Sequence, residues 1–424
     1  MKKTFLLIML IVLTMTSGQW SIVNAQKYVG GDISMLKKFV DEGAIYKDKS
    51  GNVVEPLGFF SQQGWNSMRV RLFVDPSKAT AQAKKEGVIQ DLEYVKALGK
   101  QIKDAGFSFM LDFHYSDTWT DPGQHSTPSS WSSLDATQLA QKVYDYTSDC
   151  LQQLKAAGAE PDFIQVGNEI TTGMLWPTGE ISKGGDTWDN LANFLRQGIK
   201  ACRDVCPNAQ VVIHTEMHGN SNGAKNFYAT LAGYTDIQYD IIGLSYYPDH
   251  HGPLAYLRGL LNTLVSKYPD KKIMIVETGY GFEYHIGTTY DVTSTYPLTD
   301  AGQLKFTQDL IALLNGYSNV NGLYWWYPEY NLNGIINKNG YEDWTKDFTA
   351  GYWNAALFWP KSGYPLSALY ELKEFAPNTD ISATPIDNGQ LTNDNYYTLD
   401  GRCVANGQLP RGIYIHNGKK VVIK

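Results

Sequence analysis

Residues 92–113 read LEYVKALGKQIKDAGFSFMLDF and combine a helix with the strand that follows it. Leu92, Val95, Leu98 and Ile102 are spaced three to four apart, which marks one apolar face of a helix. The run Ser108–Phe113 is short and mostly apolar, as expected for a buried strand. A helix that leads directly into a buried strand is the repeating unit of a parallel α/β fold.

The same alternation recurs along the whole chain. The predicted strands are Lys27–Gly31, Ser67–Phe73, Ser108–Phe113, Phe163–Gly167, Gln210–Ile213, Ile241–Leu244, Lys272–Val276 and Gly322–Trp325. The predicted helices between them include Ile33–Glu42, Leu92–Ala105, Ala136–Ala157, Trp188–Cys206, Pro253–Lys267 and Thr299–Leu314. Eight such units predict a (β/α)8 TIM barrel over residues 26–377, with long loops after the third, fourth, seventh and eighth strands. An open doubly wound sheet is the alternative, but no glycine-rich dinucleotide fingerprint follows the first strand.

Composition narrows the class of protein. The chain has 424 residues with 36 Lys+Arg against 43 Asp+Glu, a net charge of -7, and no basic run. Nucleic acid is therefore excluded as a partner, because phosphate binding needs clustered cations. Aromatic residues make up 13% of the chain. They indicate either a large aromatic core or exposed rings that stack on the flat apolar face of a ligand.

The two ends of the chain differ from the barrel. Lys2 and Lys3 precede an apolar run, and Val23-Asn24-Ala25 forms a small-x-small site, which predicts a signal peptide over 1–25. The run is too short for a membrane span, and no other stretch is long enough. Export to the periplasm, cell surface or exterior is expected. At the other end, 378–394 are predicted to be a linker and 395–424 a short β-hairpin tail turning at Asn417-Gly418. The segment LPRGIYIHNGKKVVIK (409–424) resembles C-terminal sorting modules of some secreted bacterial proteins, and a simple appended hairpin is the alternative.

Four cysteines lie in the exported part, at Cys150, Cys202, Cys206 and Cys403. Cys202 and Cys206 are four residues apart near the end of a predicted helix, where either a disulfide or two buried thiols would fit. The cysteines and histidines are too scattered for a zinc site.

Two glutamates stand at the ends of apolar strands. Glu169 lies in FIQVGNEI (163–170) on the fourth strand, and Glu277 follows the apolar part of IMIVETGY (273–280) on the seventh. Both are expected at the carboxyl mouth of the barrel, where such enzymes place their active sites. Two carboxyl groups that flank one bond are the usual machinery of polysaccharide hydrolysis. The pair therefore indicates a glycosidase rather than two solvated loop charges.

Further polar and aromatic residues occupy matching positions. Arg69 and Arg71 are two residues apart on the second strand and therefore share a face. An arginine on that face can keep Glu277 ionised. The alternative for Arg69 is an ion pair on the protein surface. His114, Asp117 and Trp119 lie at and after the third strand and are candidates for sugar contact. Tyr246 and Tyr247 end the sixth strand, where a tyrosine can either hydrogen-bond the nucleophile or pack. Trp325 and Trp326 end the eighth strand, where an indole can form the floor under a sugar ring.

Several segments resemble glycoside hydrolase family 53, the endo-β-1,4-galactanases of a clan of retaining (β/α)8 enzymes. They are GGDISML (30–36), VRLFVDP (70–76), LDFHYSDTWTDPGQ (111–124), IQVGNEI (164–170), IIGLSYYPDHHG (241–252) and IVETGYGF (275–282). The resemblance implies Glu169 as general acid/base, Glu277 as nucleophile and Asn168 as a ligand of the sugar 2-hydroxyl. It also implies that Arg71 or Arg69, His114, Tyr246 and Trp326 or Trp325 line the cleaved-sugar subsite, with Asp117 and Trp119 nearby. Two segments depart from the family pattern. They are Gly-Tyr-Gly, which comes after Glu277 and Thr278, and HTEMHG, at the end of the fifth strand. These departures concern the outer subsites.

The implied reaction is hydrolysis of internal β-1,4 links of galactan with retention of configuration. Glu169 must then be protonated near neutral pH, and the charge of Glu277 is expected to raise its pKa. A mannanase or cellulase of the same clan is the nearest rival, and a non-catalytic glycan-binding barrel is another. No cofactor is expected; calcium is not assigned, because GFEYHIGTTYDVT (281–293) offers only scattered Asp and Glu. Galactan is the expected partner and a monomer the expected state.

Overall fold

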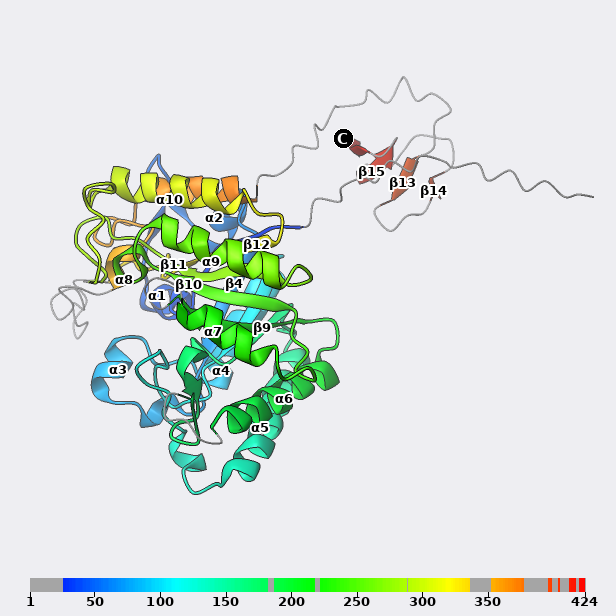
Figure 1. The fold of residues 1–424 in the computed structure, drawn as a ribbon. Coiled ribbons are helices and arrows are strands. Elements are labelled where there is room, and N and C mark those ends of the chain that lie inside the picture. Colours follow the sequence, from blue (N-terminus) through cyan, green and yellow to red (C-terminus); the bar gives the residue numbers. More distant parts are fainter. Residues whose placement is uncertain are drawn as a thin grey trace, which may run out of the picture.

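Eight parallel strands close into a barrel in the computed structural model (Figure 1). The structure describes residues 26–181, 187–217, 222–287, 289–335, 352–376, 396–398, 403–404, 412–416 and 419–423. The barrel strands are β1 (Tyr28–Asp32), β4 (Ser67–Leu72), β5 (Ser108–Phe113), β6 (Phe163–Val166), β9 (Gln210–Glu216), β10 (Ile241–Tyr246), β11 (Lys272–Thr278) and β12 (Val320–Trp326). Each pairs in parallel with its neighbours, and β1 closes the circle between β12 and β4. The predicted (β/α)8 fold is confirmed.

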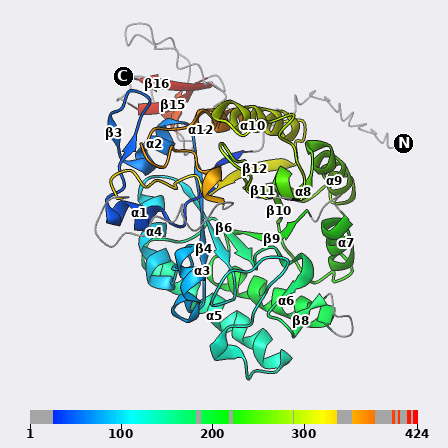
Figure 2. The ribbon, with the colours of Figure 1, turned by 90° about the vertical axis from the view of Figure 1, so that its left-hand side faces the viewer.

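Helices surround the barrel on its outside (Figure 2). The longer ones are α4 (Leu92–Asp104), α5 (Ala136–Ala156), α6 (Thr187–Val205), α7 (Asn222–Leu231), α9 (Leu254–Lys267) and α10 (Asp300–Leu314). The shorter ones are α1 (Leu36–Glu42), α2 (Pro56–Gln62), α3 (Ala81–Lys85), α8 (Pro248–His251) and α12 (Ser367–Glu371). Small two-stranded sheets join β2 (Tyr46–Lys47) to β3 (Val53–Val54) and β7 (Gly173–Met174) to β8 (Gly179–Glu180). No helix in the described part of the chain is long and apolar enough to cross a membrane.

The α4–β5 unit shows how the sequence encodes this fold. The Asp91 side chain caps α4 by accepting a hydrogen bond from the Tyr94 backbone N–H at 2.8 Å. Val95, Leu98 and Ile102 are the buried apolar face. Gly106 has a φ of 84°, the left-handed conformation that favours glycine and turns the chain into β5.

Alternation along the strands divides the barrel interior into an apolar layer and a polar layer. One buried cluster contains Met110, Phe163, Val212, Ile241, Met274, Val276 and Tyr324. Two residues further along their strands, and hence on the same face, Met110 is followed by Asp112, Phe163 by Gln165 and Val212 by His214. The apolar layer supports the barrel, and the polar layer lies nearer to the carboxyl mouth, where it can hold a site.

The predicted helix over Ile33–Glu42 begins later than expected, at Leu36. The Oδ1 atom of Asp32 accepts hydrogen bonds from both the backbone N–H and the hydroxyl of Ser34. This local turn competes with helix geometry, as short polar side chains commonly do. The result is an Asp32 carboxylate fixed below the barrel mouth.

The end of the chain forms a separate antiparallel sheet in the order β14-β13-β15-β16. Its strands are β13 (Tyr396–Thr398), β14 (Cys403–Val404), β15 (Gly412–His416) and β16 (Lys419–Ile423). The predicted linker (378–394), the turn Asn417-Gly418 and the predicted signal peptide (1–25) lie outside the described residues. The proposed domain limits therefore stay predictions.

Among the described cysteines, Cys150, Cys202 and Cys206 are buried free thiols. The open alternative for Cys202 and Cys206 is thus resolved in favour of two thiols. Cys202 lies within α6 and Cys206 directly follows it, and both pack in the core, where a cysteine behaves as a small apolar residue.

A buried acid, Glu329, predicts how the stability of the barrel depends on pH. Its side chain is fully buried after β12 and accepts a hydrogen bond from the Met35 backbone N–H at 2.9 Å. Burial, reinforced by Asp32, raises the pKa of Glu329 from 4.5 to about 8. The folded protein therefore holds this proton where the unfolded chain releases it, and stability falls as pH rises from about 4.5 through about 8.

We expect Glu329→Gln to remove this loss, because glutamine can accept the Met35 hydrogen bond without an ionisable group. The variant should gain up to about 5 kcal/mol over wild type above pH 8, and much less at pH 5. Urea unfolding at the two pH values measures the difference. An equal change at both would contradict the assignment of the proton to Glu329.

Candidate active site

A cavity of about 750 Å3 opens at the carboxyl ends of the barrel strands. It is lined by four glutamates (Glu86, Glu169, Glu216 and Glu277), by the aromatic side chains of Trp119, Tyr247 and Trp326, and by His114, His250 and His251. Asn168, Thr120 and Asp121 also contribute. Carboxyl groups and flat rings thus converge in one concave site, the usual form of a ligand pocket.

Glu277 lies near the end of β11 and is only 7% exposed. Its Oε1 atom is 2.9 Å from Nη2 of Arg69, and its Oε2 atom accepts a hydrogen bond from the Tyr247 hydroxyl at 3.0 Å. Burial raises the pKa of Glu277 to about 7, and Arg69 and Tyr247 act in the opposite direction. Both partners favour the carboxylate form, so this is the carboxyl group of the cavity that is equipped to stay ionised.

Glu169 follows β6 and has a different setting. Its φ of 47° and ψ of 45° are left-handed, an uncommon conformation for a residue with a side chain. The backbone is fixed on both sides: its N–H donates to Nδ1 of His214 at 3.3 Å, and its C=O lies 3.3 Å from Nε2 of His125. Burial and the nearby Glu277 raise the pKa of Glu169 well above its usual value, while a hydrogen bond with Ser245 lowers it. The strained backbone therefore presents a carboxyl group that favours the protonated form.

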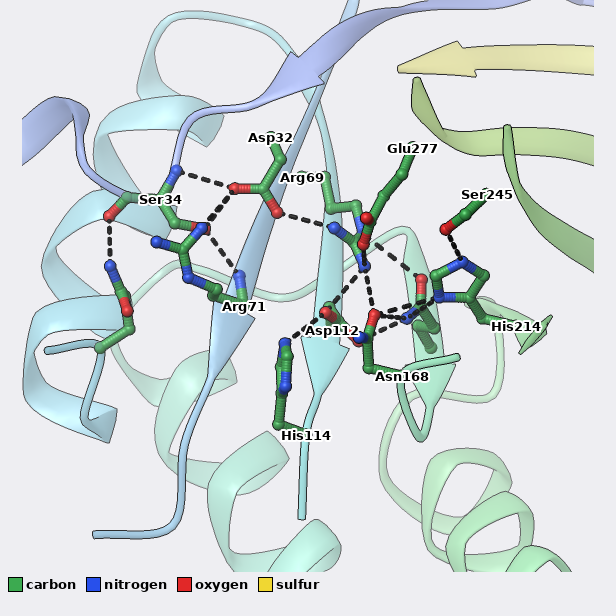
Figure 3. A network of polar contacts seen from close by, with 12 residues as sticks. Asp32, Ser34, Arg69, Arg71, Asp112, His114, Asn168, His214, Ser245 and Glu277 are labelled. Atoms are coloured by element: carbon green, nitrogen blue, oxygen red, sulfur yellow. Dashed lines mark hydrogen bonds and ion pairs between the residues drawn. The ribbon is translucent and has the colours of Figure 1, made fainter. Parts of the chain in front are cut away.

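Arg69 holds Glu277 within a network of buried polar side chains (Figure 3). It is 1% exposed, and its guanidinium pairs with Asp32 and Asp112 at 2.8 Å each as well as with Glu277. The same Nη2 group donates to Oδ1 of Asn168 at 3.0 Å. A planar five-donor group suits this shared role, because it can satisfy several acceptors in one plane. Arg69 is thus a buried ion-pair centre and not a surface ion pair.

Asn168 is held in one orientation. Its Oδ1 atom accepts from Arg69, and its Nδ2 atom donates to the Thr120 carbonyl at 2.8 Å. The remaining amide N–H is the group that can reach a ligand in the cavity.

One wall of the cavity is aromatic. His114 stands 3.2 Å from Asp112 and accepts a hydrogen bond from the Thr120 backbone N–H. The rings of Trp119 and Trp326 are neighbours, tilted by 55° with their centroids 6.3 Å apart. The six predicted residues that line the cavity are Asn168, Glu169, Glu277, His114, Trp119 and Trp326.

The remaining predicted residues do not line it. Arg71 bonds Asp32 and the Gly87 carbonyl, and its guanidinium lies 4.6 Å from the Trp119 ring, so it supports that ring from behind. Asp117 accepts hydrogen bonds from the N–H and hydroxyl of Ser129 at 2.8 and 2.7 Å, which ties the loop after β5 together. Both shape the wall rather than touch the space.

Tyr246 and Trp325 need correction, and strand alternation explains both. Tyr246 is fully buried and donates to the Gly252 carbonyl at 2.8 Å, away from the cavity, while the next residue, Tyr247, lines it and bonds Glu277. Trp325 is also fully buried and donates from Nε1 to the Ala355 carbonyl, whereas Trp326 lines the cavity. In each pair only the second residue shares the inward face.

Sequence reasoning missed a group of polar residues around the site. They are Asp32, Asp112, Gln165, His214, Glu216, Ser245, His250 and His251. All but His250 and His251 lie within barrel strands, two residues apart from apolar inward positions or at strand ends. That spacing along the strands is the sequence signal that could have identified these residues. Within the described residues, no cluster of three or more His, Cys, Asp or Glu could hold a metal ion.

Comparisons with known proteins agree with this geometry. Residues 28–372 match the family model described as glycosyl hydrolase family 53. The arabinogalactan endo-β-1,4-galactanase A of Aspergillus niger is 31% identical over 74% of this chain and 89% of its own length. A probable enzyme of that name from Aspergillus terreus is 32% identical over 78% and 94%.

Solved structures point the same way. The family 53 catalytic domain from Ignisphaera aggregans superposes with a TM-score of 0.71, at 30% identity over 82% of this chain and 96% of that one. A fungal β-1,4-galactanase superposes with a TM-score of 0.69, at 28% identity over 82% and 99%. The family match covers the whole barrel, including every strand that contributes to the cavity. The chain is therefore a member of glycosyl hydrolase family 53.

Proposed function

We propose that this protein hydrolyses internal β-1,4-galactosidic bonds of galactan and arabinogalactan with retention of configuration. The observation that carries the proposal is the unequal setting of two carboxyl groups in one cavity. Glu277 is held by Arg69 and Tyr247, whereas Glu169 is buried beside another carboxyl group. The substrate class rests on relatives of about 31–33% identity that are named arabinogalactan endo-β-1,4-galactanases.

The two groups divide the work of a double displacement. Glu277 attacks the anomeric carbon, and Glu169 donates its proton to the leaving oxygen. The covalent sugar–Glu277 ester removes the negative charge that raised the pKa of Glu169. Glu169 then takes a proton from water, which attacks the same carbon and releases Glu277. Asn168 is proposed to hold the 2-hydroxyl, and Trp119 and Trp326 to stack on the sugar faces.

The direct test is hydrolysis of linear β-1,4-galactan, β-1,4-mannan and soluble cellulose by the purified protein. We expect a rapid fall in viscosity and release of oligosaccharides from galactan, with the β-anomer appearing first in the proton NMR spectrum. Preference for mannan or cellulose would favour the rival clan activities, and binding of galactan without cleavage would favour a glycan-binding barrel.

The remaining proposals concern where and how the enzyme works. We propose that residues 1–25 direct export, that the mature protein acts as a monomer outside the cytoplasm, and that residues 395–424 form an appended β module. Cleavage after Ala25 can be read from the N-terminal sequence of the mature protein. Size-exclusion chromatography with light scattering tests the monomer.

Tyr247 gives a matched pair of variants with its neighbour. We expect Tyr247→Phe to lower kcat/KM on galactan by about 10- to 100-fold, because the carboxylate of Glu277 loses a hydrogen bond to a charged group. The same loss raises the pKa of Glu277, so the acidic limb of the pH profile should move to higher pH. Tyr246→Phe removes a buried hydroxyl that bonds the Gly252 carbonyl and should change neither quantity. Equal losses in the two variants would exclude the proposed role of Tyr247.

A further inference from the structure

His125 is a buried histidine between β5 and α5 that the proposed mechanism does not use. It is 1% exposed, and its Nε2 atom lies 3.3 Å from the backbone carbonyl oxygen of Glu169. A carbonyl oxygen accepts and cannot donate, so Nε2 carries a proton and His125 is the donor of this hydrogen bond. Among the described residues, the other ring nitrogen, Nδ1, has no hydrogen-bond partner. The hydrogen bonding of this imidazole is therefore directed at Glu169.

The His125 ring is held in place by the loop that follows Glu169. The backbone N–H of Trp176 donates to the His125 carbonyl at 2.7 Å, and the two rings pack with their centroids 5.5 Å apart. The Thr127 hydroxyl donates to the Trp176 carbonyl at 2.8 Å. Burial lowers the pKa of His125 to about 3, so the imidazole is neutral at the pH values at which a glycosidase works. The structure thus presents a fixed, uncharged N–H donor to the peptide after Glu169.

The backbone that receives this hydrogen bond is strained. Glu169 has a φ of 47° and a ψ of 45°, and a residue with a side chain keeps such a conformation only where its surroundings hold it. On the amino side, the N–H of Glu169 faces Nδ1 of His214 at 3.3 Å. That nitrogen is shared, because it also lies 2.9 Å from the Gln165 amide and 3.1 Å from Oδ1 of Asn168. The carbonyl side, by contrast, has a donor of its own in His125.

We propose that His125 is a positioning residue for the acid/base Glu169, because its Nε2–H holds the Glu169 carbonyl and keeps the backbone in the left-handed conformation that aims the carboxyl group at the leaving oxygen. The inference rests on the proposed function and extends it. A change of φ and ψ moves the Cβ atom, so a relaxed backbone would turn the carboxyl group away from its target. Proton transfer requires a separation of about 2.6–3.2 Å, so a small rotation is enough to impair it.

The nucleophile has separate supports, and this makes the role of His125 measurable. Glu277 is held by Arg69 and Tyr247, so it should stay in place when His125 is changed. Cleavage of galactan needs a proton from Glu169, whereas an aryl β-galactobioside with an acidic phenol needs only the nucleophile for its first step. The value of kcat/KM reports that first step for both substrates. Misplacement of Glu169 alone should therefore slow galactan cleavage selectively, whereas general damage to the cavity should slow both.

The experiment measures kcat/KM on both substrates for wild type, His125→Phe, His125→Gln and Thr127→Val. We expect His125→Phe to lower the value for galactan by about tenfold and that for the aryl substrate by less than about twofold. His125→Gln restores an uncharged N–H donor and should recover the wild-type ratio of the two values. Thr127→Val is the matched control, because it removes a hydrogen bond between the same two loops that does not involve Glu169, and it should keep the wild-type ratio.

Equal losses on the two substrates in His125→Phe, or no loss on galactan, would overturn the inference. A galactan-selective loss of the same size in Thr127→Val would also overturn it, because the contact between the loops would then set the position of Glu169. The same loss in folded His125→Gln would exclude the hydrogen bond as the cause. Thermal unfolding confirms that each variant is folded, and His125→Leu, which is smaller and also lacks a donor, replaces the phenylalanine variant should that ring not fit. If wild type does not cleave galactan, the proposed function fails instead.

Discussion

Replacement of Glu277 by glutamine is expected to lower galactan hydrolysis by about 10⁴-fold or more, with the barrel still folded. The amide cannot attack the anomeric carbon, so no covalent intermediate forms. Glutamine keeps the volume of the side chain in a position that is 7% exposed, and its oxygen can still accept from Arg69. Binding should survive the change, because the sugar contacts proposed for Asn168, Trp119 and Trp326 are untouched.

Glu329→Gln is the matched control for this experiment. Both residues are buried glutamates near the carboxyl ends of neighbouring strands, but only Glu277 lines the cavity. Initial rates on galactan at pH 6 should be near wild type for Glu329→Gln and absent for Glu277→Gln. Calorimetric titration with galacto-oligosaccharides should detect binding to Glu277→Gln, which cannot cleave them. Wild-type-like turnover by pure Glu277→Gln would remove the nucleophile from the mechanism.

Local patterns in the sequence were sufficient to predict the barrel. The strand Ser108–Phe113 was predicted with its observed bounds, and the others within a few residues, because apolar runs and caps are local signals. Helix α7 (Asn222–Leu231) was missed, although its buried residues Ala224, Phe227, Tyr228 and Leu231 have helical spacing. The polar, glycine-containing residues on either side of its start are more typical of a loop, and they masked the period.

The site was predicted where it depends on position along one strand, and missed where it depends on partners across strands. Glu169 and Glu277 follow apolar runs, so their place at the mouth was a local inference. The choice between Tyr246 and Tyr247 needed the inward phase of β10, which two adjacent tyrosines do not reveal.

The buried polar network could not be predicted from local sequence patterns. Gln165 and His214 are 49 residues apart, and His214 and Ser245 are 31 apart. Their hydrogen bonds depend on the register of three neighbouring strands and on the exclusion of water by the layer below. A single histidine on an apolar strand carries no signal of such a role without that register.

The second large effect concerns Glu169, the proposed acid/base. We expect Glu169→Ala to lower galactan hydrolysis by about 10²- to 10⁴-fold, because a galactosyl leaving group needs protonation. An aryl β-galactobioside with an acidic phenol leaves without that proton, so its first step should be nearly unaffected. The covalent intermediate then accumulates, since no base activates water, and a burst of phenol followed by slow turnover is expected.

Azide distinguishes this role from general damage to the site. It needs no base, is small enough for the space left by the removed carboxyl group, and attacks the anomeric carbon while Glu277 departs as a carboxylate. Sodium azide should therefore restore steady-state turnover of the aryl substrate by Glu169→Ala and yield a β-glycosyl azide, since two inversions at one carbon give retention.

Glu216→Ala is the control, because it also removes a carboxyl group from the same cavity, one that pairs with His251 at 3.4 Å. Glu216 has no proposed part in proton transfer, so azide should neither accelerate this variant nor appear in its product. Rescue of both variants would mean that azide only fills space. An α-glycosyl azide from Glu169→Ala would indicate a single displacement. Glu277 would then act as a base on water and would form no covalent bond to the sugar.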